Sequence, residues 1–142
     1  MSATSVQFTV AVHIMAALAF YRGREIASGA LARSVNANPS FVRKSLSKLS
    51  KAGLIVTTRG KRGASVLARP AKKITLLDIY RASAAPPAFA IHGYRVEKRC
   101  PVSCTIKERL SLVLERAQGS FEKSLAAITL AEVAAALPGK SP

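Results

Sequence analysis

The chain has 142 residues, with 22 lysines and arginines against 7 aspartates and glutamates, so its net charge is +15 at pH 7. This length suits one compact domain with a real core, or a small head joined to an oligomerisation element. The positive surplus predicts a polyanionic partner, with a membrane surface or ribosomal RNA as alternatives. A hydrophobic share of 49% and the grouping of the basic residues argue against a ribosomal role. The few acids, with no nucleophile–base–acid set and no phosphate-binding glycine loop, argue against an enzyme.

The sequence predicts no membrane partner. The longest apolar run, residues 10–21, is interrupted by His13 and is shorter than the ~20 residues that a membrane span needs. Residues 1–4 lack the charged region of a signal peptide. We therefore expect a cytosolic protein whose two cysteines are reduced at rest and available for chemistry.

The first predicted element is a helix over residues 5–21 that is apolar on most of its faces, which is typical of a buried helix. Ser28 is then expected to cap a short helix over residues 29–34. Asn38 is a favourable N-cap for the next helix, and Pro39 suits its first position.

That next helix, over residues 40–52, is the most informative. Val42, Leu46 and Leu49 recur at spacings of four and three, which places the apolar side chains on one face. The basic side chains are left on the other faces, and Gly53 is expected to end the helix.

Two strand-like runs follow, over residues 54–58 and 64–67, on either side of a basic turn at residues 59–63. A basic helix beside a basic hairpin can enter one groove of DNA and hold the phosphates alongside it. The segment 26–67 therefore predicts a helix-turn-helix with a wing.

The chain then continues through a linker, a short helix and a loop. Residues 68–73 are predicted to be the linker. Thr75 is placed to cap a helix over residues 76–82. Residues 83–99, which contain two adjacent prolines and little periodicity, are predicted to be a loop.

A long amphipathic helix is predicted to begin at Thr105, which forms a capping-box spacing with Glu108. Its apolar side chains recur every three or four residues, and the stripe they form is longer than a small head could cover. They are Ile106, Leu110, Val113, Ala117, Phe121 and Leu125. We favour a homodimer interface over an intramolecular core, because DNA-reading proteins of this size usually pair to match two half-sites. A second capping box, Thr129 with Glu132, opens a final helix that ends before Pro138.

The predicted fold is mainly α-helical with a small β-wing: a winged helix-turn-helix head followed by a long dimerisation helix. Residues 1–82 are the expected DNA-binding domain. Residues 83–104 are the expected loop that carries the cysteine pair, and residues 105–137 hold the dimerisation helix and the C-terminal helix.

Several stretches together resemble the Rrf family of bacterial winged-helix transcriptional regulators, which includes the iron–sulfur cluster regulator and the nitric-oxide-sensitive repressor. They are NPSFVRK (38–44), LSKAGL (49–54), RGKRG (59–63), LARP (67–70), ITLLDIYRA (74–82) and ITLAEV (128–133). Their order and spacing make the match specific over nearly the whole chain. The resemblance implies a homodimer on a partly palindromic DNA operator, and repression more often than activation. The wing departs slightly, because Gly63 is followed by Ala64 where many members carry two adjacent glycines.

The candidate DNA contacts gather at the start of the recognition helix and on the wing. Arg43 is suited to pairing with a guanine edge, which is worth ~1–3 kcal/mol of discrimination. Phe41 suits a thymine methyl, or else a partly buried position. Lys48 suits a phosphate, and the wing cations suit a minor groove or the backbone, although any one of these charges can also be merely solvated. The full predicted set is Ser28, Asn38, Ser40, Phe41, Arg43, Lys44, Ser47, Lys48, Arg59, Lys61 and Arg62.

The resemblance also raises the question of whether this chain binds an iron–sulfur cluster. Cluster-binding family members carry three cysteines before the long helix and a fourth, non-cysteine ligand, whereas this chain has only Cys100 and Cys104. The family's histidine ligand falls here on Lys107, and its acidic first-helix ligand falls near Val10. We therefore predict no conventional iron–sulfur cluster, no other metal and no other cofactor.

The two thiols suit redox chemistry on independent grounds. Basic residues flank them on both sides, and Pro101 is placed to start a helix, so positive charge and a helix N-terminus both favour the reactive thiolate. A disulfide within the pair, disulfides across a dimer, and two inert thiols are all open at this point. An unconventional cluster completed by His13 or His92 is open as well.

We therefore expect a homodimeric, sequence-specific regulator of transcription, and more specifically a repressor that responds to redox or related stress through Cys100 and Cys104. One alternative is a cluster-sensing regulator with non-cysteine ligands. The other is a weakly specific, basic nucleic-acid-binding protein.

Overall fold

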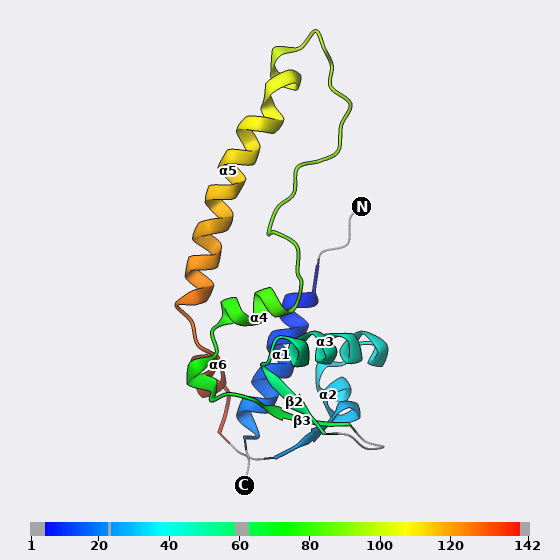
Figure 1. The fold of residues 1–142 in the computed structure, drawn as a ribbon, viewed down its shortest axis with the longest axis vertical. Coiled ribbons are helices and arrows are strands. Elements are labelled where there is room, and N and C mark those ends of the chain that lie inside the picture. The colour runs from blue at the N-terminus through cyan, green and yellow to red at the C-terminus, as the bar shows by residue number, and fades with distance from the viewer. Residues whose placement is uncertain (1–4, 23, 59–62, 140–142) are drawn as a thin grey trace. The chain divides into compact units, whose positions relative to one another are not determined.

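The computed structural model describes residues 5–22, 24–58 and 63–139. It contains two compact units, Met1–Ala85 with Leu125–Pro142, called the head below, and Pro86–Ser124. The head is mostly helical, as predicted, and it contains a small three-stranded sheet (Figure 1). Among the described residues, none of the helices combines the length and the apolar character needed to cross a bilayer.

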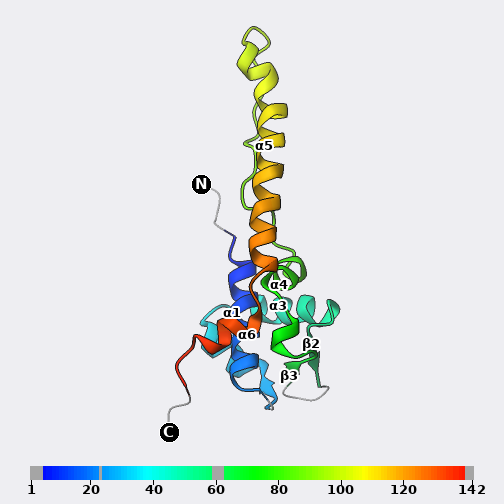
Figure 2. The ribbon, with the colours of Figure 1, turned by 90° about the vertical axis from the view of Figure 1, so that its left-hand side faces the viewer.

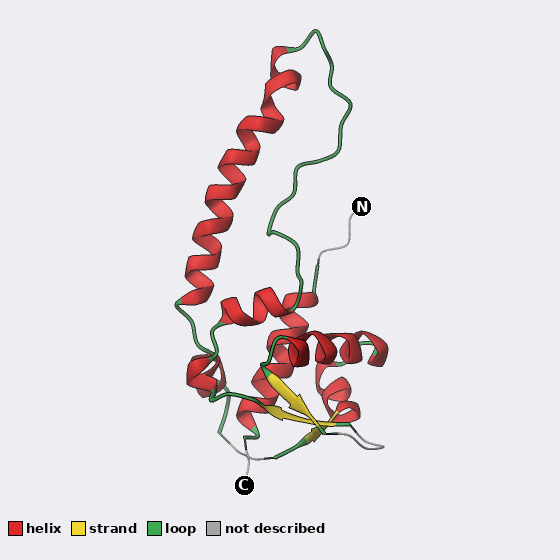
Figure 3. Ribbon diagram, in the orientation of Figure 1, coloured by secondary structure: helices red, strands yellow, loops and turns green. Residues whose placement is uncertain are grey.

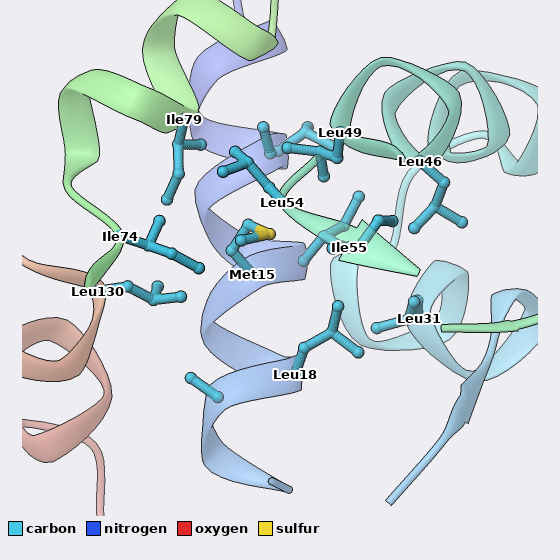
Figure 4. Close-up of a cluster of buried hydrophobic side chains, with 14 of the residues drawn as sticks. Met15, Leu18, Leu31, Leu46, Leu49, Leu54, Ile55, Ile74, Ile79 and Leu130 are labelled. Carbon is cyan, nitrogen blue, oxygen red and sulfur yellow. The ribbon is translucent and has the colours of Figure 1, made fainter. Parts of the chain in front are cut away.

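Helix α1 (Gln7–Phe20) lies at the centre of the head. Seven of its 14 residues are buried, and Ala11, Ile14 and Met15 are fully shielded from solvent. Helices α2 (Ser28–Val35), α3 (Pro39–Lys51), α4 (Leu76–Ala82) and α6 (Leu130–Ala135) all contact α1. Figure 4 shows Ile74 and Leu130 on one side of α1, with Leu31 and Leu46 on the other. The all-round apolar pattern of this segment is therefore explained by neighbours on several sides.

The sheet contains one strand that the sequence did not predict. Strands β2 (Ile55–Thr57) and β3 (Ala64–Leu67) form the expected antiparallel hairpin. Strand β1 (Ile26–Ala27) adds to the other edge of β3, with Ile26 opposite Ser65 (Figure 3). A strand of two residues carries no detectable alternation, so only its partner β3 reveals it.

Helices α4 and α6 begin side by side at a short bridge, although about fifty residues separate them in the sequence. Thr75 and Thr129 are antiparallel bridge partners. The Leu76 N–H donates to the Ile128 carbonyl at 2.9 Å, and the Leu130 N–H donates to the Ile74 carbonyl at 2.8 Å. Helix α6, which we had grouped with the long helix in residues 105–137, therefore packs in the head. Its Leu130 is fully buried there.

Each of these two helices carries the predicted threonine cap. Thr75 accepts from the Asp78 N–H at 3.1 Å, and the Asp78 carboxylate accepts from the Thr75 N–H at 2.9 Å, which completes a capping box. Thr129 likewise accepts from the Glu132 N–H at 3.1 Å.

The second unit consists of a loop and most of α5 (Pro101–Ala126). Helix α5 begins four residues before the predicted cap at Thr105, so the loop does not reach residue 104. Thr105 lies inside the helix, where its hydroxyl donates to the Pro101 carbonyl at 2.6 Å. Proline is favoured at the first helical position, and here that preference prevails over the capping-box pattern.

We predict that Thr75→Ala lowers the free energy of unfolding by about 1 kcal/mol, because it removes an N-cap and leaves the Asp78 N–H without its acceptor. Thr105→Ala is the matched control, and it should change that free energy by less than about 0.5 kcal/mol, since alanine is favourable inside a helix. Urea unfolding of the full chain, followed by circular dichroism at one fixed protein concentration, measures both. Equal losses for the two variants would contradict the role given to Thr75.

Candidate nucleic-acid interface

The start of α3 is built as predicted. The Asn38 side-chain oxygen accepts from the Ser40 N–H at 2.8 Å, and Pro39 occupies the first helical position. The turn before it is set by Asn36, whose φ of 55° lies in the left-handed region that asparagine tolerates better than most residues. Asn38 is thus a cap, and its side-chain oxygen is engaged in that role.

The faces of α3 separate as the periodicity predicted. Val42, Leu46 and Leu49 are buried. The opposite face exposes four of the predicted contact residues, and they are Ser40, Arg43, Lys44 and Ser47. At the far end Gly53 adopts a φ of 75°, the left-handed conformation expected of a helix stop.

Two predicted contact residues have other partners in the head. Phe41 is half-buried and packs against the hydrophobic core, which matches the second of its two expected positions. The Lys48 ammonium donates to the Ser83 carbonyl at 3.4 Å, so this side chain ties α3 to the end of α4. Lys48 is half-buried, and its ammonium is engaged by this carbonyl, whereas Arg43 and Lys44 are exposed.

A hollow of about 320 Å³ lies between α2 and α3. Ser28 and Arg43, which we had predicted as contacts from two different helices, both line it. Arg33, which the sequence reasoning missed, lines it as well, and no carboxylate does. Arg33 could have been found from its place one helical turn after Gly29, on the same face of α2. Cationic side chains beside the N-terminus of α2 favour a phosphate in this hollow.

Ser28 does not cap α2 as predicted. It is the first helical residue, and the preceding Ala27 makes no side-chain bond to the helix. The Ser28 N–H instead donates to the Gly63 carbonyl at 3.2 Å, which ties the start of α2 to the hairpin. The short strand β1 ends at Ala27, and this leaves no room for a cap at Ser28.

The base of the wing is ordered by hydrogen bonds between its two strands. Both the N–H and the hydroxyl of Thr58 donate to the Ala64 carbonyl, at 2.8 and 3.2 Å. The predicted wing contacts Arg59, Lys61 and Arg62 lie outside the described residues.

The cysteine pair lies at the start of α5 rather than in a loop. The Cys104 N–H donates to the Cys100 carbonyl at 3.1 Å, and the Cys100 sulfur accepts from the Ser103 N–H at 3.4 Å. Both thiols are free, and Cys104 is the more exposed of the two. The preceding loop is held against this turn, because the Tyr94 hydroxyl donates to the Ser103 carbonyl at 2.8 Å.

This geometry limits what the two thiols can do. Residues four apart on a helix hold their Cβ atoms about 5–6 Å apart, whereas a disulfide needs about 3.5–4.5 Å. A bond between Cys100 and Cys104 therefore requires the first turn of α5 to open. In the part of the chain that the structure describes, no three His, Cys, Asp or Glu side chains gather as metal ligands. The residues present thus do not fit a cluster. His92, which the sequence left open as an additional ligand, stacks on Tyr94 with ring centroids 4.9 Å apart.

The predicted apolar stripe of α5 divides into three environments. Ile106, Val113 and Ala117 are exposed. Leu110 and Phe121 are half-buried, and Phe121 lines a hollow of about 130 Å³ with Ala88 and Phe89 of the same unit. Leu125 is only 7% exposed within the chain itself, which leaves little of its side chain for a partner. Periodicity predicts which side chains share the apolar face of a helix, but it does not predict which surface packs against them.

The sequence analysis missed one apolar residue on the open face of α5. Val102 is 64% exposed, beside 59% for Val113 and 38% for Ile106. The spacings of four and seven residues place these three side chains on one side of the helix. The signal was hidden because the helix was expected to begin only at Thr105.

Comparisons with known proteins agree with this architecture. The model of the Rrf2 family of iron-dependent transcriptional regulators matches residues 4–136. YwnA of Bacillus subtilis strain 168, named as an HTH-type transcriptional regulator, is 34% identical over 128 residues, which cover 89% of this chain and 93% of YwnA. A crystal structure of a protein of Lactobacillus plantarum, named as a transcriptional regulator, is 29% identical with a TM-score of 0.76 and covers 92% of this chain and 88% of its own. The cysteine regulator CymR of B. subtilis shares the fold at 23% identity with a TM-score of 0.67, over 97% of this chain and all of its own.

Proposed function

Because the chain belongs to the Rrf2 family of transcriptional regulators, we propose that it is a homodimeric, sequence-specific DNA-binding repressor. The observation that carries this proposal is the exposed basic face of α3 beside the cationic hollow at the start of α2. Two elements that converge on one basic surface are what a duplex requires. The net charge of +15 adds the long-range attraction that brings the protein to DNA.

The contacts divide by role. The N-terminal half of α3 enters the major groove, where Arg43 reads a guanine edge and Ser40, Lys44 and Ser47 line the groove beside it. The hollow that contains Ser28 and Arg33 holds a backbone phosphate. The wing cations Arg59, Lys61 and Arg62 reach the adjacent backbone or minor groove. Lys48, whose ammonium bonds to the Ser83 carbonyl, contributes less to DNA binding than Lys44.

The first test is a footprint on the DNA upstream of the protein's own gene. We expect a sharp protected site, to which Arg43→Ala binds more weakly by about 1–3 kcal/mol while its binding to unrelated duplexes changes less. Lys44→Ala should weaken binding to all duplexes and Lys48→Ala should do so less, with Arg95→Ala, at an exposed position in the loop before α5, as the matched control. Joint replacement of Lys61 and Arg62 by alanine should reduce the slope of log affinity against log salt by roughly 1 for each phosphate that is no longer neutralised.

Two outcomes would contradict this assignment. Similar affinity for every duplex, with no protected site and no effect of Arg43→Ala, would favour the alternative of a weakly specific nucleic-acid-binding protein. An unchanged salt slope in the Lys61 and Arg62 double variant would remove the wing from the interface.

We further propose that α5 forms the dimer. Val102, Ile106 and Val113 form an apolar strip that lies open to solvent on one side of this 26-residue helix. Spacings of four and seven match the repeat along which two helices pack. A symmetric pair of heads would then present two recognition helices to a partly palindromic operator.

Val113→Asp should shift the monomer–dimer equilibrium toward monomer by at least roughly tenfold, because it places a charge in the interface. Leu112→Asp is the matched control: Leu112 is also exposed, at 56%, but it points about 100° away around the helix. Sedimentation equilibrium of both variants distinguishes the strip from general apolar exposure. Equal effects, or a wild-type protein that stays monomeric, would overturn the dimer assignment.

For the signal, we propose thiol oxidation at Cys100 and Cys104. Both thiols are free, the Cys104 side chain is exposed to soluble oxidants, and the two cysteines flank a single helical turn. Hydrogen peroxide would accept two electrons and two protons from two thiols, forming one disulfide and two waters. Either a bond within one chain, which opens the first turn of α5, or bonds between two chains would alter the start of the dimer helix.

We predict that peroxide treatment weakens operator binding roughly tenfold in the wild type and leaves the Cys100→Ser, Cys104→Ser double variant unchanged. Non-reducing electrophoresis separates bonds within one chain from bonds between chains. Protein isolated without oxygen should be colourless and free of iron, because the described residues do not assemble a cluster site. Visible absorption bands with bound iron would instead support the cluster-sensing alternative, and identical binding before and after peroxide would leave the thiols inert.

A further inference from the structure

One hollow of the head does not belong to the surface described above. It is a groove of about 850 Å³ between the C-terminal end of α1, the segment that follows β3, and α6. In Figures 1 and 4, α6 and its Leu130 lie on the opposite side of α1 from α3 and its Leu46. Figure 2 shows α6 alongside α1 from the neighbouring direction. A duplex held by the exposed face of α3 would therefore leave this groove free.

The walls of the groove are apolar. Leu18 and Phe20 of α1, Leu67 of β3, and Ala131, Ala134 and Ala135 of α6 line it. The side chains that α6 presents here are only methyl groups, so the two helices leave a space that larger side chains would have closed. Its volume lies within the range of pockets that bind small organic molecules, about 300–1,000 Å³.

The rim of the groove is cationic. Arg22, Arg69 and Lys72 line it, and no aspartate or glutamate does. The Arg69 guanidinium lies 3.8 Å from the Asp78 carboxylate, so its charge is partly matched. Arg22 and Lys72 are exposed, and no aspartate or glutamate among the described residues that line the groove matches their charge. An occupant of complementary chemistry carries a single anionic group at one end and an apolar body at the other.

We propose that this groove binds a free amphipathic monoanion, such as a medium-chain carboxylate. Its apolar chain lies along Leu18 and the alanines of α6, where burial removes hydrocarbon from water. Its carboxylate accepts charge-assisted hydrogen bonds from Arg22 and Lys72 at the rim. A nucleic-acid backbone fits less well, because it would satisfy the cations but leave the apolar walls uncovered. This binding is independent of DNA recognition and would stand even if the proposed regulatory function failed.

Direct titration of the full chain with dodecanoate, below its micelle concentration, tests the proposal by calorimetry without DNA. We expect one site per chain, with dodecan-1-ol binding roughly tenfold more weakly because it has the same chain length but no charge. Displacement of 1-anilinonaphthalene-8-sulfonate, followed by the loss of its fluorescence, gives a second readout.

Two pairs of variants locate the site. Joint replacement of Arg22 and Lys72 by glutamate should weaken dodecanoate binding more than roughly tenfold, whereas Arg24→Glu, an exposed arginine two residues from Arg22 that does not line the groove, should leave it unchanged. Ala135→Leu should fill the groove and weaken binding of the acid and the alcohol alike. Ala136→Leu, at the neighbouring exposed position outside the groove, is its control.

Thermal unfolding of every variant shows whether its fold is retained. Binding that is lost in the groove variants, with wild-type melting curves, supports the proposal. Absence of saturable binding to the wild type would overturn it. Equal binding by the wild type and both groove variants would overturn it as well, because the probe would then occupy another apolar surface such as the strip on α5.

Discussion

The head depends on the burial of α1 on nearly all of its faces. With Ala11, Ile14 and Met15 fully shielded, this helix cannot be stable in water unless neighbours surround it. Helices α2 and α3 pack on part of its surface, and α6 covers another part. The exposed basic face of α3 and the groove beside α6 therefore share one support. The position of α3 is set by apolar contacts made on the side opposite its exposed basic face.

Local interactions explain what the sequence predicts well. Three residues, Asn38, Gly53 and Thr75, each act through backbone groups within three or four residues. Their roles can therefore be predicted from the neighbouring residues in the sequence. The errors arise where the outcome depends on distant partners. The pairing of Ile26 with Ser65 creates a strand that has no pattern of its own. Leu125 continues an apolar stripe, but the chain itself buries it. At Thr105 two local signals competed, and the proline four residues earlier determined where the helix begins.

In the candidate site, too, local patterns predicted some residues correctly, and the others depend on partners distant in sequence. The type and spacing of Arg43 and Lys44 in α3 were enough to predict an exposed basic face. Lys48 looked equivalent on the helix, yet its ammonium bonds to a carbonyl 35 residues away in sequence. Arg33 gains its place only because the turn at Asn36 brings α2 and α3 together around one hollow. Residues that converge from separate elements can be recognised only once the turn that joins those elements is known.

The bridge between Thr75 and Thr129 has a consequence for how such a protein can diversify. It ties the start of α4 to the start of α6, so residues 86–124, which leave the head after α4 and return to it before α6, form a loop whose two ends are anchored in the head. The entropy of closing a loop grows only logarithmically with its length. Insertions, deletions or new ligand residues within residues 86–124 should therefore cost the head little stability. The segment over residues 86–124 can therefore vary in length or in side chains while the packing of the head is retained.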